Sequence, residues 1–198
     1  DTLFINSSFA QSSYMENRGV IFFKSPTNFI KCIETKFVNG KIDGSSLGTL
    51  YTEKITFSEN SILGKCNLKV SKSTVIKDTL TLISKNGTKD FKNLINYGKL
   101  FNSANEDLNL SGYLENKGKI SFKQGKIVFQ KPTYIKGTLS VKTLKLSETL
   151  IVLDSLTILE EVIGKGKLVN RGILQLGVMN SKFKIDSLNL KHRLNLHF

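Results

Sequence analysis

Carboxylates that could form a catalytic pair are few in this chain. Three carboxylates fall in or near apolar segments, Asp154, Glu160 and Glu161, and two more, Glu106 and Asp107, fall in a polar segment. A glycosidase needs two carboxyl groups about 5–10 Å apart, whereas adjacent residues such as Glu160 and Glu161 face opposite sides of a strand. We therefore expect scattered, solvent-facing carboxylates and no enzyme activity.

The histidines and glycines form no known catalytic pattern either. His192 and His197 are the only histidines, so a Ser-His-Asp arrangement in the body of the chain is excluded. They stand five residues apart, on opposite faces of an expected strand, with no cysteine or carboxylate beside them to complete a metal site. The stretch "GKGKL" at 164–168 lacks P-loop spacing. We expect no metal and no cofactor.

Lysine is the one reactive residue type present in excess. Lys and Arg number 29 against 16 Asp and Glu, a net charge of +13, and no run of five like charges occurs. Such singly spread lysines are typical of a solvated face. Outward positions of the expected strands nevertheless carry five lysines that form a candidate basic wall for a sulfated glycan or a phosphate backbone: Lys119, Lys123, Lys126, Lys142 and Lys145. No sequence pattern of a nucleic-acid-binding domain accompanies them, so a specific nucleic acid is not expected.

The tyrosines are open to two interpretations. They either supply a platform for a sugar or pack as single residues at corners of the fold. The five are Tyr14, Tyr51, Tyr97, Tyr113 and Tyr134.

Alternation of apolar and polar residues runs through the whole chain and predicts an all-β fold. In "KISFKQGKIVF", Ile120 and Phe122 point one way, and Ile127 and Phe129 repeat the pattern after Gly125. Segments of four or five such residues are separated by one to three residues of the turn-forming kinds. Two architectures fit short strands of this kind, an antiparallel sandwich and a parallel β-solenoid.

The spacing of asparagines favours the solenoid. The separation of Asn17 and Asn39 is 39 − 17 = 22, and that of Asn96 and Asn116 is 116 − 96 = 20. A period of about 20 residues is that of a coil that returns to the same wall after each turn. We therefore predict a right-handed parallel β-helix of roughly eight or nine coils, each of about 19–23 residues. The repeated Asn-x-Gly is expected to mark a corner, because both residues tolerate left-handed backbone angles.

Residues 1–198 are expected to form a single solenoid domain or a fragment of a longer rod, since the chain begins at an Asp without a signal segment. Residues 85–112 are predicted to hold a polar loop or corner insertion, with a short helix at 89–95 as an option. Cys32 and Cys66 are interpreted as small core residues, with one disulfide as the alternative. No apolar run is long enough to span a membrane.

The units "ENRGVIFF", "YLENKGKISF" and "GKGKLVNRGILQL" resemble the degenerate repeats of filamentous haemagglutinin-like exoproteins, which are exported by two-partner secretion, and of autotransporter passengers. The Asn-Pro-Asn motifs of that secretion domain are absent here. The resemblance implies a non-enzymatic secreted or cell-surface rod, acting in adhesion or as a shaft presenting a terminal domain. Its implied partners are a host-cell glycan or receptor and an outer-membrane transporter. The alternatives are a β-helix polysaccharide-processing enzyme or tailspike-like glycan binder, and a self-assembling scaffold.

Overall fold

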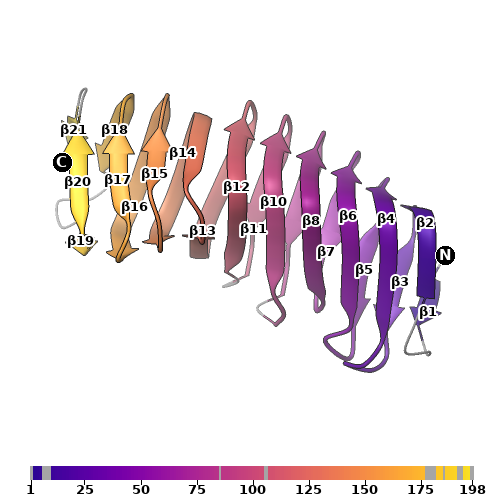
Figure 1. Ribbon diagram of the computed structural model, residues 1–198. Coiled ribbons are helices and arrows are strands. Elements are labelled where there is room, and N and C mark those ends of the chain that lie inside the picture. The colour runs from indigo at the N-terminus through magenta and orange to yellow at the C-terminus, as the bar shows by residue number, and fades with distance from the viewer. Residues whose placement is uncertain are drawn as a thin grey trace.

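The structure is a computed structural model, and it describes residues 2–5, 10–84, 86–104, 107–176, 182–184, 186–190 and 194–196. These residues build an elongated stack of strands with the two termini at opposite ends (Figure 1). The secondary structure within the described ranges is entirely β, as the alternation predicts.

Between residues 10 and 116, long strands alternate along the chain with short ones, and the long ones lie side by side along one face of the stack (Figure 1). In chain order the strands are β1 (Thr2–Ile5), β2 (Ala10–Asn17), β3 (Val20–Phe23), β4 (Phe29–Phe37), β5 (Lys41–Gly44), β6 (Thr49–Phe57), β7 (Ser61–Leu63), β8 (Asn67–Ile76), β9 (Thr79–Leu82), β10 (Lys89–Asn96), β11 (Lys99–Asn102), β12 (Leu108–Asn116), β13 (Lys119–Phe129), β14 (Thr133–Leu146), β15 (Leu150–Val152), β16 (Ser155–Gly164), β17 (Lys167–Asn170), β18 (Ile173–Leu176), β19 (Lys182–Lys184), β20 (Ser187–Leu190) and β21 (Leu194–Leu196).

The strand pairing confirms a parallel β-solenoid and rules out the antiparallel sandwich. Each strand pairs in parallel with the equivalent strand one turn later, for example β4 with β6 and β6 with β8. The chain completes about nine turns. The right-handed sense of the coil stays a prediction.

The turns are slightly shorter than the spacing of the asparagines predicts, and their length varies. Thr133 pairs with Leu150 (150 − 133 = 17), whereas Val20 pairs with Lys41 (41 − 20 = 21). The shortest turns involve β13, β14 and β16, which run through corners without separate turn residues. β14 is 14 residues long and pairs with four other strands, β12, β13, β15 and β16.

Three walls can be distinguished from the register of the pairing. Wall A contains residues 10–12, 30–32, 50–52, 68–70, 89–92 and 108–110. Wall B contains residues 14–17, 34–37, 54–57, 73–76, 94–96 and 114–116. Wall C contains the short strands β1, β3, β5, β7, β9 and β11 and residues 119–122. In β4, two successive exposed residues, Ile33 and Glu34, shift the alternation from wall A to wall B.

The inward positions of the walls form columns of apolar side chains that run along the stack. Phe37 and Phe57 follow one another in wall B, with ring centroids 5.4 Å apart, and Phe91 of wall A packs against Phe57 with ring centroids 6.3 Å apart. Full burial of one such side chain stabilises the fold by about 1.5–3 kcal/mol. Because each inward residue contacts its equivalents in neighbouring turns, the core is continuous, although every turn alone is too thin to hold one.

The asparagines of the repeated motif lie at the corner between wall B and wall C, where the sequence predicts a corner. Buried Asn96 donates from Nδ2 to Oδ1 of Asn116 at 2.7 Å, and Asn116 donates in turn to the carbonyl of Thr138. Asn170 donates to the carbonyl of Gly172 at 2.7 Å. The side chains thus bond backbone carbonyls that the corner removes from the ladder.

The glycine of the motif is required for a different reason from the one expected. The non-glycine residues at positive φ are Asn39 and Asn93 in the described ranges, and Gly118 is not among the positive-φ glycines. A Cβ on Gly118 would instead lie 2.0 Å from the carbonyl oxygen of Gly98. Glycine here permits the close approach of successive corners.

The segment 85–112 differs from the prediction of a polar loop. Most of it is strand: β10, β11 and the start of β12 pair in register with the turns before and after them. The optional helix at 89–95 is part of β10. Alternation through "KDFKNLIN" determines the structure here, in spite of the polar composition.

Cys32 and Cys66 are both buried and neither forms a disulfide, so the core interpretation is confirmed and the disulfide alternative is wrong. Cys32 lies in β4 of wall A, and burial raises the pKa of its thiol.

Replacement of Gly118 by alanine should destabilise the protein by about 1–3 kcal/mol, because the new methyl group meets a neighbouring carbonyl rather than a movable side chain. Ser121→Ala on the outward side of β13 is the matched control and should change the stability by less than about 0.5 kcal/mol. Urea denaturation followed by circular dichroism measures both. Equal midpoints for the two variants would contradict the close-approach explanation.

Candidate functional site

The five lysines of the candidate basic wall do not share one wall. Lys119 begins β13 on wall C, next to the corner with wall B, whereas Lys145 occupies an outward position paired in register with Val128 and Ile163. Lys142 is held by Glu160 at 3.0 Å. Lys126 is half-buried at the start of the wall-A part of β13. The side chain of Lys123 lies outside the described residues. The binding role predicted for these lysines remains a prediction.

Lys119 instead belongs to a basic cluster that the sequence did not reveal. It pairs in register with Lys99 of the preceding turn, and both are exposed. Two residues earlier in each turn stand Tyr97 and Lys117, with the Lys117 ammonium 5.1 Å from the centroid of the Tyr97 ring. We call Tyr97, Lys99, Lys117 and Lys119 the basic corner.

Charge is only partly balanced in the basic corner. Lys117 pairs with Glu115 at 3.1 Å, and the hydrogen bond from this pair raises the pKa of Lys117. Lys99 and Lys119 have no ion-pair partner among the described residues. Like charges at paired positions of neighbouring strands are destabilising, so a bound polyanion would relieve their repulsion.

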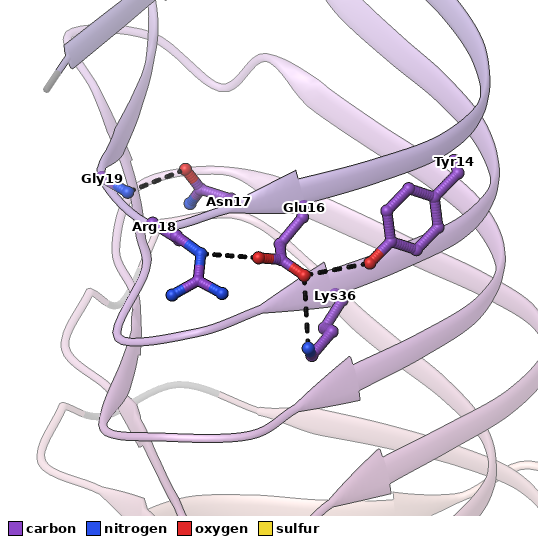
Figure 2. A network of polar contacts seen from close by, with 6 residues as sticks. All are labelled: Tyr14, Glu16, Asn17, Arg18, Gly19 and Lys36. Atoms are coloured by element: carbon purple, nitrogen blue, oxygen red, sulfur yellow. Dashed lines mark hydrogen bonds and ion pairs between the residues drawn. The ribbon is translucent and has the colours of Figure 1, made fainter.

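A second polar network lies on wall B near the N-terminus (Figure 2). The Glu16 carboxylate accepts hydrogen bonds from Arg18 Nε at 2.6 Å, Tyr14 Oη at 3.1 Å and Lys36 Nζ at 3.2 Å. Glu16 and Lys36 are register partners in neighbouring turns, so the network ties one turn to the next. Its donors, Arg18 first, hold the pKa of Glu16 below its usual value. A carboxylate of lowered pKa is a poor general acid at neutral pH.

The other carboxylates considered for catalysis have structural partners or lie apart. Asp154 accepts a bond from the Gly137 N–H at 2.6 Å, and Asp107 accepts one from the Lys126 N–H at 2.9 Å. Glu160 pairs with Lys142. Glu106, His192 and His197 lie outside the described residues. Over the described ranges, no group of three or more His, Cys, Asp or Glu is placed to hold a metal ion.

One buried cation was missed at the level of sequence. Lys89 is fully buried in an inward column of wall A, between Leu68 and Leu108, and donates to the carbonyl of Cys66 at 2.7 Å. The sequence could have revealed its burial, because Lys89 precedes inward Phe91 by two residues and strand alternation puts both side chains on one face.

Comparison of the chain with protein-family models, curated proteins and solved structures finds no match. The part of the chain that the structure describes contains no helix that could cross a membrane.

The basic corner should bind heparin in a salt-dependent way. Removing two charges in Lys99→Gln/Lys119→Gln should weaken binding and flatten the plot of log affinity against log salt concentration, because fewer counterions are released. The control Lys54→Gln/Lys165→Gln removes two exposed lysines from elsewhere. Heparin titration at several salt concentrations compares them, and equal losses would show a delocalised charge effect instead.

The Glu16 network should stabilise the protein near neutral pH and lose this effect in acid. A lowered pKa means that the contribution is present above the usual glutamate value of 4.5 and is lost as the pH falls through the folded-state pKa. Glu16→Gln should therefore lower the melting temperature near neutral pH and have little effect at about pH 2. Glu34→Gln, a neighbour on wall B, serves as control. A pH-independent difference would contradict the assignment.

Proposed function

We propose that the protein is a non-enzymatic segment of a secreted or cell-surface exoprotein, which acts in adhesion or as a shaft presenting a terminal domain. The observation that supports this most is the uninterrupted parallel ladder from β1 to β21, in which each turn stacks on the next. A stack of this kind gains length with every turn while its cross-section stays constant. That property suits a spacer or a long contact surface.

Several features favour a binding surface over an enzyme. Three of the carboxylates considered for glycoside hydrolysis already have a partner: Glu160 pairs with Lys142, Asp154 accepts from Gly137 and Asp107 accepts from Lys126. The outward positions carry exposed lysines and tyrosines instead, as in the basic corner. The partner that such a surface fits is an acidic host-cell glycan or surface receptor. An outer-membrane transporter would be a further partner if export follows the two-partner route.

Antibodies raised against the purified chain should label intact cells of the organism that produces it, or detect the chain in the culture medium, because an exoprotein is accessible without permeabilisation. An antibody against a cytoplasmic protein of the same cells is the control for leakage. Labelling that requires permeabilised cells would overturn the secreted location. Release of reducing ends from acidic polysaccharides by the purified chain would overturn the non-enzymatic role.

A further inference from the structure

A recess of about 290 Å³ opens on the outer face of wall A, across β4, β6 and β8, which lie side by side (Figure 1). It is separate from the basic corner. Its lining comes from three successive turns and consists of Lys31, Cys32, Tyr51, Thr52, Glu53, Lys69, Val70 and Ser71. A volume of this size matches one sugar ring or a group of similar bulk rather than a whole drug-sized ligand.

The centre of the recess is an aromatic ring held in place by its neighbours. Tyr51 is 38% exposed. Phe29 packs against it edge-on, with ring centroids 6.0 Å apart at 89°, and the Lys69 ammonium lies 5.6 Å from the centroid. A fixed and partly open ring of this kind can pack against the C–H face of a pyranose at little cost in side-chain entropy.

Two cations flank the ring along the stack. Lys31, Tyr51 and Lys69 are consecutive partners in the pairing of β4, β6 and β8, so the two lysines start two strand spacings apart, roughly 9.6 Å. Both are exposed, and neither forms an ion pair with any carboxylate of the described ranges. Their charge is available to the acid group of a ligand whose ring lies over Tyr51.

The edge of the recess supplies groups that suit hydroxyls. Glu53 is held by Lys72 at 2.6 Å, which fixes the carboxylate and offsets its charge while its oxygens remain acceptors. Ser71, which also lines the recess, is exposed. A carboxylate here can accept hydrogen bonds from sugar hydroxyls, so the lining offers an acceptor that suits a sugar.

We propose that this recess binds an acidic sugar residue, a uronate or a sulfated hexose, within a polysaccharide. The ring packs on Tyr51, the acid group bonds Lys31 or Lys69, and the hydroxyls bond Glu53 and Ser71. Such a site would add a second glycan contact to the basic corner if the protein acts in adhesion. It does not depend on that role, because the recess would bind equally well on a shaft that only presents another domain.

Isothermal titration of the whole chain with two tetrasaccharides tests the site. The acid groups of the first, from hyaluronan, are all uronates, and the second, from chondroitin sulfate, also carries sulfate. Tyr51→Ala should lower the affinity for the tetrasaccharide that binds more tightly by about tenfold, and Lys31→Gln/Lys69→Gln should lower it by at least about fivefold. Tyr51→Phe should keep most of the affinity, since the ring face is retained. Lys54→Gln, which removes an exposed charge from a residue that does not line the recess, should change it less than about twofold.

The lysine double variant keeps the test valid if Tyr51→Ala fails to fold, because both lysines are exposed and unpaired; circular dichroism checks each variant. Absence of saturable binding by either tetrasaccharide overturns the proposal. So does an equal loss in Lys54→Gln and in the lysine double variant, or tighter binding of oligothymidine through the same residues. None of these results bears on surface labelling of intact cells, so failure here is distinguishable from failure of the proposed function.

Discussion

The structure depends above all on the stacking of each turn on the one before it. Parallel backbone hydrogen bonds join equivalent strands, and the same register places inward residues in columns such as Phe37, Phe57 and Ile76. A single turn can bury its apolar side chains only against its neighbours. Every other feature, including the glycine corners and the outward lysines, has to be compatible with this register.

The corners show how tightly the stacking constrains sequence. Asn96 and Asn116 bond each other across turns, and Gly118 leaves room for the carbonyl of Gly98. A side chain at the glycine would push the turns apart, and an apolar residue at the asparagine would leave corner carbonyls without a partner. The Asn-x-Gly repeat therefore reports on architecture, and binding residues must be sought on the outward face of the walls.

The outward faces combine lysine with tyrosine in two places. In the basic corner, Lys117 lies over Tyr97, and in the recess of wall A, Lys69 lies over Tyr51. A residue in one turn meets its equivalent in the next at strand spacing, so single residues scattered through the sequence assemble into ligand-sized groups. This is how a chain without a compact motif can present a binding surface.

The sequence by itself determined the all-β class, the approximate period of the coil and the asparagine corners, because alternation and spacing are local properties that stacking only repeats. It also contained the inward position of Lys89, two residues before Phe91. Only the tertiary structure decided which lysines are neighbours: Lys119 joins Lys99, Lys142 joins Glu160, and Lys31 and Lys69 flank Tyr51. The turns differ in length along the stack, and a shift of one residue reverses the face on which a side chain lies, so these neighbours follow from the register and not from the spacing in the chain.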